Sequence, residues 1–186
     1  MMEQNSKIKP YKILIMGLDN SGKTSILISL SEESNILSFC SLKPTIGVEV
    51  KTFDTTGSAI MSVWDFGGQE KFREEYLQNF KNYLEGTNKI IFVIDVQEIK
   101  RYNLALEYFE NVFNLLKDNS NHPELSIFLH KYDPNLNLKK EFIEIDEIIE
   151  SKLITKLQGI IPQEYGFKLY KTSIYTVFDK CLIQLE

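Results

Sequence analysis

The chain has few of the features that mark secreted, membrane-spanning or nucleic-acid-binding proteins. Its 186 residues contain two cysteines, Cys40 and Cys181, too few for the disulfide framework of a small secreted domain. No signal-like segment opens the sequence, and no apolar run approaches the roughly 20 residues of a membrane span. The formal net charge is −5 without a basic face, which argues against a nucleic-acid partner. We therefore expect a cytoplasmic chain, with peripheral association at membranes left open.

Length and composition predict a single domain. A chain of 186 residues that is 43% hydrophobic is long enough to bury one core and short for two. We take residues 1–10 as a short N-terminal extension and residues 11–186 as the domain.

Apolar runs that favour strands alternate with segments of helical spacing. The expected strands cover 11–16, 48–54, 59–64, 89–95 and 125–130, with another ending near 171. The expected helices lie within 24–30, 105–116, 145–157 and 176–185. The turn-forming stretch TTGS between two of these strands predicts an antiparallel hairpin. The fold class is therefore predicted to be α/β, a mostly parallel six-stranded sheet with one antiparallel hairpin and helices on both faces.

A glycine-spaced Lys-Thr pair follows the first expected strand. The stretch GLDNSGKTS places Gly17, four residues, Gly22, Lys23 and Thr24 between a strand and a helix, as a phosphate-binding loop requires. Glycines let backbone N–H groups turn toward phosphate oxygens, the lysine supplies a cation, and the threonine hydroxyl can bind Mg²⁺. The loop alone does not distinguish ATP from GTP.

Later segments add residues that suit the same ligand. PTIG places Thr45 in a loop where it could close over Mg²⁺ and a terminal phosphate, and VWDFGGQE ends a strand with Asp65, which could hold Mg²⁺ through water. HKYD and KTSI each follow an expected strand, at the carboxyl edge where ligands of α/β sheets bind.

These motifs together resemble a Ras-superfamily small GTPase. GLDNSGKTS, PTIGVEV and VWDFGGQEKFR resemble the Arf and Arf-like pattern, whereas HKYD and KTSIY are similar to Rag proteins, whose guanine motif also begins with His. The motifs run in order from Gly17 to Ile174, so the resemblance covers essentially the whole chain. It implies a P-loop small GTPase fold that binds GTP or GDP with Mg²⁺.

The resemblance also assigns roles to individual residues. The Asp133 carboxylate can accept two hydrogen bonds from guanine that adenine does not offer, His130 can donate from its ring, and Lys131 can lay its stem along the base. The backbone of Ser173 and Ile174 would meet the guanine oxygen. The residues expected to bind the nucleotide are Asp19, Asn20, Ser21, Gly22, Lys23, Thr24, Ser25, Thr45, Gly68, His130, Lys131, Asp133, Ser173 and Ile174. The expected Mg²⁺ residues are Thr24, Thr45 and, through water, Asp65.

Hydrolysis requires an oriented water and neutralisation of charge on the phosphoryl group. Gln69 is the expected catalytic residue. No arginine in cis is obvious, because Arg73 is interpreted as a surface charge and Arg101 as the start of a helix. Asp19, expected beside the terminal phosphate, would slow turnover further. We therefore expect slow hydrolysis that an activating partner accelerates, in a GTP/GDP switch acting in trafficking or signalling.

The N-terminus departs from the Arf pattern because MMEQNSKIKP has no glycine for N-myristoylation. An exchange factor, a GTPase-activating protein and effectors are expected but unidentified, and we expect a monomer, with a dimer left open. Two alternatives remain: a nucleotide-binding scaffold without turnover, and a P-loop ATPase or kinase. The second is disfavoured because such enzymes commonly use additional arginines.

Overall fold

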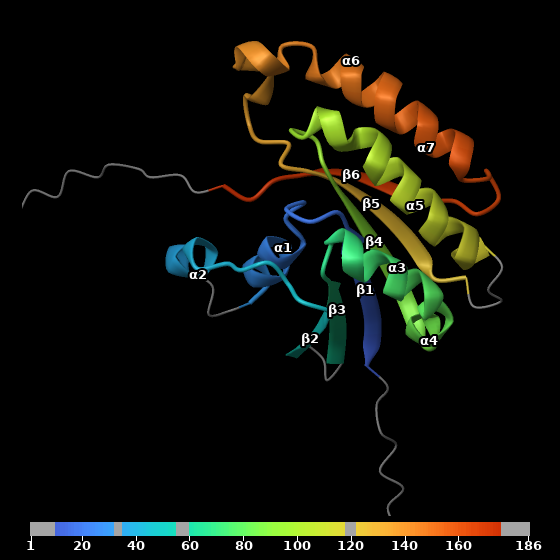
Figure 1. The fold of residues 1–186 in the computed structure, drawn as a ribbon. Coiled ribbons are helices and arrows are strands. Elements are labelled where there is room, and N and C mark those ends of the chain that lie inside the picture. The colour runs from blue at the N-terminus through green and yellow to red at the C-terminus, as the bar shows by residue number, and fades with distance from the viewer. Residues whose placement is uncertain (1–9, 32–34, 55–59, 118–121, 176–186) are drawn as a thin grey trace, which may run out of the picture.

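The computed structural model describes residues 10–31, 35–54, 60–117 and 122–175. Their strands form one six-stranded sheet in the order β2-β3-β1-β4-β5-β6 (Figure 1). The strands are β1 (Tyr11–Gly17), β2 (Val48–Asp54), β3 (Ile60–Phe66), β4 (Thr87–Asp95), β5 (Glu124–His130) and β6 (Lys168–Thr172). The pair β2–β3 is antiparallel, and the other four pairs are parallel. The predicted sheet and its antiparallel strand pair are confirmed, while the TTGS stretch expected to turn between these strands lies outside the described residues.

Helices cover both faces of the sheet, as predicted. The helices are α1 (Lys23–Ser29), α2 (Ile36–Cys40), α3 (Glu70–Gln78), α4 (Phe80–Leu84), α5 (Tyr102–Lys117), α6 (Ile145–Ile149) and α7 (Thr155–Ile160), with a π-helical segment η4 (Glu150–Ile154) joining the last two and 3₁₀ turns η1 (Ile99–Arg101), η2 (Leu136–Leu138) and η3 (Lys140–Phe142). Figure 1 shows α1 and α2 on one side of the sheet and α3, α5, α6 and α7 on the other. The helix expected within 176–185 lies outside the described residues.

The core divides between the two faces because successive strand residues point to opposite sides. Leu14 and Met16 of β1 join the larger cluster under α5, α6 and α7. Ile13 and Ile15 pack with Leu27 of α1 in the smaller one. The sheet is therefore fixed between layers, and its loops are the parts free to carry a site.

Parallel pairing brings the carboxyl ends of distant strands to one edge of the sheet. Ile15 lies opposite Asp65, and Asp95 lies opposite His130. The loops that follow β1, β3, β4 and β5 therefore meet at this edge, where open α/β sheets bind ligands. Within the described part of the chain, no helix is both long and apolar enough to cross a membrane.

Candidate functional site

The loop between β1 and α1 turns around the Lys23 ammonium. Gly22, the residue before α1, has a φ of 92°, and Asn20 has a φ of 60°, so two residues of the turn adopt left-handed conformations. Glycine adopts this conformation freely, whereas a left-handed residue of another type, such as Asn20, is a feature that concentrates at functional sites. Lys23 is only 5% exposed, and its Nζ donates to the carbonyl oxygens of Gly17 at 3.1 Å and Leu18 at 2.7 Å. Burial lowers the pKa of Lys23 to about 8.

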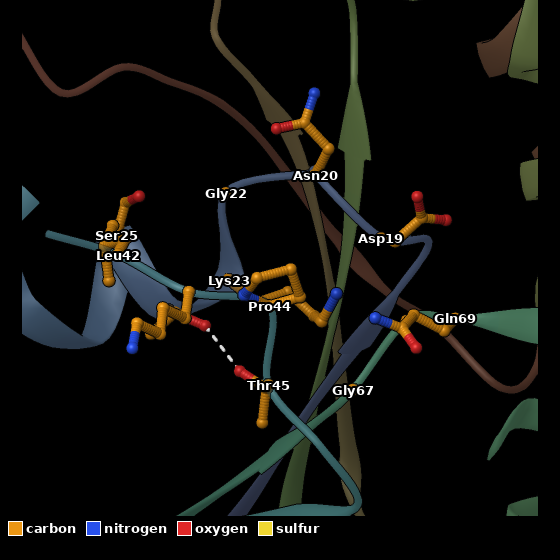
Figure 2. A pocket seen from close by; sticks show the side chains of 13 residues that line it. Asp19, Asn20, Gly22, Lys23, Ser25, Leu42, Pro44, Thr45, Gly67 and Gln69 are labelled. Carbon is orange, nitrogen blue, oxygen red and sulfur yellow. Dashed lines mark hydrogen bonds between the residues drawn. The ribbon is translucent and has the colours of Figure 1, made fainter. Parts of the chain in front are cut away.

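Three oxygen-bearing side chains converge beside this lysine. The Thr24 hydroxyl donates to Asp65 Oδ2 at 2.7 Å and lies 3.0 Å from the Thr45 hydroxyl, which is itself 3.2 Å from the same carboxylate oxygen. Figure 2 marks the contact between the two hydroxyls. The three residues come from α1, the loop before β2, and β3, as the predicted Mg²⁺ set requires.

Asp65 is completely buried, and its second carboxylate oxygen, Oδ1, has no hydrogen-bond partner among the residues that the structure describes. Burial raises its pKa, although the bonds from Thr24 and the charge of Lys23 act in the opposite direction. An unpaired buried carboxylate oxygen is costly unless a cation or an ordered water completes it. Hydroxyl and carboxylate oxygens are the donors that Mg²⁺ prefers, so these residues fit that ion.

A cavity of about 260 Å³ opens over these groups. In Figure 2, Asp19 and Gln69 lie on one side of it and Ser25 and Leu42 on the other. Its lining residues are Asp19, Asn20, Gly22, Lys23, Thr24, Ser25, Leu42, Lys43, Pro44, Thr45, Gly67, Gly68 and Gln69. The cavity therefore collects most of the predicted phosphate and metal residues together with the predicted catalytic Gln69. Ser21 is buried behind it, at 2% exposure.

The double glycine before Gln69 has a steric reason. A Cβ on Gly68 would stand 2.1 Å from the backbone nitrogen of Asp19, and one on Gly67 would stand 2.4 Å from the Thr45 carbonyl oxygen. The Gly67 N–H also donates to the Gly47 carbonyl at 2.9 Å. The two loops that flank the β2–β3 hairpin are therefore packed against each other, and the second also meets the phosphate loop.

The HKYD and KTSI segments meet on the other side of the phosphate loop. Asp133 Oδ1 accepts a hydrogen bond from the Ser173 hydroxyl. Its Oδ2 accepts one from the Gln97 side-chain amide at 2.9 Å. Lys131 bridges the Asn20 carbonyl at 2.8 Å and the Asp95 carboxylate at 2.6 Å. The candidate base-binding residues are thus physically tied to the phosphate loop. Ser173 was expected to act through its backbone alone, and its side chain has a contact that the sequence did not indicate.

His130 is buried at 3% exposure and lies behind the phosphate loop, outside the lining of the cavity. Its Nδ1 lies 2.9 Å from the Thr172 hydroxyl. A Cβ on Gly22 would approach the ring Cδ2 to 2.4 Å, so the ring packs directly on the loop backbone. Burial, followed by the charge of Lys131, lowers the pKa of His130, which keeps the imidazole neutral at pH 7. A direct bond from His130 to a base stays a prediction. Ile174 is half-buried beyond β6.

Asp19 forms an ion pair with Arg101, a contact that the sequence did not indicate. Its Oδ1 is 2.5 Å from Nη2 of Arg101, and Nη1 of the same guanidinium donates to the Asp19 carbonyl at 3.2 Å and to Glu98 at 2.9 Å. Asn20 donates to the other oxygen of Glu98 at 3.3 Å. Arg101 does precede a helix, as predicted, but its side chain returns to the phosphate loop.

Arg73, interpreted as a surface charge, is half-buried and has a contact that the sequence did not indicate. Its guanidinium carbon lies 5.3 Å from the ring centre of Tyr108, and its Nε is buried without a hydrogen-bond partner in the described part of the chain. Arg73 therefore joins α3 to α5. Sequence reasoning also missed Gln97, because no motif marks it. Its position two residues after the end of β4 was the available signal, since that strand ends at the same edge as β1 and β5.

Comparison with known proteins shows which family the chain resembles. Residues 12–182 match the family described as the Gtr1/RagA G protein conserved region. Among curated proteins, ADP-ribosylation factor J of Dictyostelium discoideum is 34% identical over 127 residues, which are 68% of this chain and 62% of that protein. The ADP-ribosylation factor-like protein alp41 of Schizosaccharomyces pombe is 32% identical over 152 residues, 80% of this chain and 73% of that protein.

Solved structures share the fold. The Arl6 BBS3 small GTPase of Trypanosoma brucei, solved with the nucleotide analogue GppNp, has a TM-score of 0.62 at 23% identity and covers 89% of this chain and 87% of its own. The mammalian SRP receptor has a TM-score of 0.62 at 18% identity, with coverages of 87% and 89%. The family match spans nearly the whole chain. The curated relatives named above are ADP-ribosylation factors and factor-like proteins, which gives the chain its Arf-like features. The chain therefore belongs to the Gtr1/RagA family of Ras-superfamily small GTPases, with Arf-like features.

Proposed function

We propose that this protein is a GTP/GDP-dependent molecular switch that hydrolyses GTP slowly. One observation carries the proposal: Thr24, Thr45 and Asp65, whose Oδ1 has no hydrogen-bond partner among the described residues, converge beside a buried lysine in a glycine-spaced loop. This set of groups suits a phosphate chain with Mg²⁺, and few other ligands would use all of them. The family match supports the same ligand class.

Each half of the nucleotide has a proposed set of contacts. Lys23 would exchange its two carbonyl partners for phosphate oxygens, which restores the charge that burial disfavours. Asp133 would accept from the N1–H and amino group of guanine, in an orientation set by Gln97 and Ser173. Adenine presents no such pair of donors, so Asp133 would select GTP over ATP.

Thr24, Thr45 and Asp65 would hold Mg²⁺, which when bound neutralises charge on the phosphates. Gln69 lines the same cavity and would orient the attacking water. No arginine is among the residues that line this cavity in the described chain. We therefore propose a turnover on the order of 10⁻⁴ per second, raised by an activating partner.

The proposed output of the switch is the arrangement of two loops. Thr45 on the first loop contacts Thr24 and Asp65, and Gly68 on the second packs against Asp19. Loss of the terminal phosphate would release these loops from one another. A change from about 1% to about 99% active requires roughly 5.5 kcal/mol of differential binding. An exchange factor and effectors would read the two states, in trafficking or signalling.

The direct test is nucleotide identity followed by turnover. Mass spectrometry of the nucleotide retained through purification should find GDP or GTP and no ATP. Single-turnover hydrolysis of GTP with Mg²⁺ should then be slow but measurable. Recovery of ATP would contradict the guanine assignment, and bound GTP that is never hydrolysed would favour the scaffold alternative.

The role of Gln69 is tested separately. Gln69→Leu should slow hydrolysis at least about tenfold while leaving GTP affinity near that of the wild type, because the glutamine acts on water. Gln78→Leu on the exposed face of α3 is the matched control and should hydrolyse GTP normally. Unchanged hydrolysis in Gln69→Leu would remove Gln69 from the mechanism.

A further inference from the structure

Arg101 contacts the phosphate loop at both the side chain and the main chain of one residue. Its Nη2 lies 2.5 Å from Asp19 Oδ1, and its Nη1 donates to the Asp19 carbonyl oxygen at 3.2 Å. Glu98 accepts from Nη1 at 2.9 Å and so fixes the guanidinium from the other side. A two-point contact of this kind sets the orientation of Asp19 and places a positive charge beside it.

Asp19 forms the wall between two hollows. On one side it lines the cavity that contains Lys23, Thr24 and Gln69. On the other side it lines a small cleft with Arg101 and Glu98. Its side chain is 44% exposed, and that of Arg101 is 29% exposed. The Asp19 carboxylate is thus held on the Arg101 side of the loop, at the rim of the proposed phosphate site.

A free carboxylate at this rim would repel a triphosphate more than a diphosphate, because the triphosphate carries additional negative charge at its end. The Arg101 guanidinium stays protonated at any ordinary pH and offsets the Asp19 charge. The pair is partly solvated, so the effect on binding is modest and decreases with salt. The pair nevertheless changes the relative affinity for GTP and GDP, the two nucleotides that a switch must distinguish.

We propose that Arg101 is a positioning residue that neutralises Asp19 and holds it away from the phosphate site, and thereby sets the preference of the loop for GTP over GDP. This inference rests on the proposed function, and it deepens it by naming what regulates the nucleotide preference. Arg101 itself contacts Asp19 and Glu98 and acts on the nucleotide through Asp19. If Arg101 only linked η1 to the phosphate loop, its loss would weaken the binding of both nucleotides equally.

The experiment measures the dissociation constants of GDP and of a non-hydrolysable GTP analogue, both with Mg²⁺, for the wild type and four variants. The readout is the ratio of the two constants. Arg101→Gln should shift this ratio toward GDP by about threefold to fivefold, the range for partly exposed charge pairs. Asp19→Asn, which leaves Arg101 without its partner, should shift it toward the GTP analogue.

The double variant, Arg101→Gln with Asp19→Asn, should return the ratio to near the wild-type value, because neither charge remains. Lys100→Gln removes the adjacent, exposed positive charge and should leave the ratio unchanged. Raising the salt concentration should shrink the shift in Arg101→Gln. If Arg101→Gln does not fold, the shift in Asp19→Asn alone still tests the charge relationship.

The inference is overturned if Arg101→Gln lowers the affinity for both nucleotides equally and the added Asp19→Asn substitution does not restore it. Arg101 would then only link η1 to the phosphate loop. An unchanged ratio in Asp19→Asn would also overturn the inference. These outcomes leave the proposed function standing, because the wild type would still bind both guanine nucleotides. Failure of the wild type to bind either of them would overturn the proposed function and this inference together.

Discussion

The side-chain amide of Gln97 donates a hydrogen bond to Asp133 Oδ2 at 2.9 Å across 36 residues of sequence. The same amide donates to the Lys131 carbonyl at 2.7 Å. Lys131 has a φ of 61°, which is unusual for a residue other than glycine or asparagine, so the contact supports a strained turn. Gln97 therefore holds both the carboxylate and the backbone of the candidate base-binding segment.

Removing this amide should weaken guanine binding. We expect Gln97→Ala to raise the dissociation constant of GDP about fivefold to tenfold, because a hydrogen bond to a charged group is lost and Asp133 is less well oriented. The preference for guanine over adenine nucleotides should fall in parallel. Titration with fluorescent GDP and competing ATP measures both. Gln78→Ala on the exposed face of α3 serves as the control, and equal affinities in the two variants would refute a role for Gln97.

Asp65 should control the effect of Mg²⁺ on nucleotide release. Its Oδ1 is buried and has no partner within the described ranges, which suits a water-bridged ion. Asp65→Ala should lower the affinity for Mg²⁺ by roughly 10- to 100-fold, the range for groups that support a metal indirectly. In the wild type, chelation by EDTA should speed GDP release, and in this variant EDTA should have little further effect. Asp54→Ala, an exposed aspartate at the end of β2, should behave as the wild type.

The lowered pKa of Lys23 predicts a pH dependence of stability. Burial shifts the pKa from 10.5 to about 8, so between these values the unfolded chain binds a proton that the folded chain has released. The free energy of unfolding of the nucleotide-free protein should therefore rise with pH across this window, by up to about 3 kcal/mol at its upper end. Bound nucleotide should flatten the dependence because the phosphates keep Lys23 charged.

Urea unfolding at pH 7.5 and 9.0 measures the first part of this rise, where the tyrosines are still mostly protonated. Lys23→Met removes the titrating group and should abolish the part of the rise that comes from Lys23. An equal rise in the wild type and in Lys23→Met would show that other groups cause it.

Gly22 should tolerate no side chain. Its φ is 92°, and a Cβ would stand 2.4 Å from Cδ2 of the buried His130 ring, whose Nδ1 is held by Thr172. We expect Gly22→Ala to lower the free energy of unfolding by about 2 to 4 kcal/mol, from backbone strain and overpacking. The matched substitution Gly159→Ala lies in α7, where a Cβ would meet open space, and should raise it by roughly 0.5 to 1 kcal/mol. Similar losses in both variants would contradict this steric explanation.

The prediction from sequence succeeded where the signal was local. The apolar runs of β1 and β4 indicate strands from consecutive residues alone. Gly17 to Thr24 likewise carry their chemistry within eight consecutive positions. The sheet, its hairpin and helices on both faces followed from such patterns. The meeting of Thr24, Thr45 and Asp65 was also expected, because each belongs to a recognisable segment at the carboxyl edge of the sheet.

The contacts between Gln97 and Asp133, between Arg101 and Asp19, and between His130 and Gly22 were decided only by the tertiary structure. Arg101 and Asp19 are 82 residues apart, and neither residue type indicates its partner. Parallel pairing gathers loops from separate strands at one edge, but which side chains then meet depends on backbone direction and packing in each loop. The sequence by itself therefore determined the fold and the class of ligand, and the folded arrangement determined how Asp19, Asp133 and His130 are held, because those contacts exist only after the strands have paired.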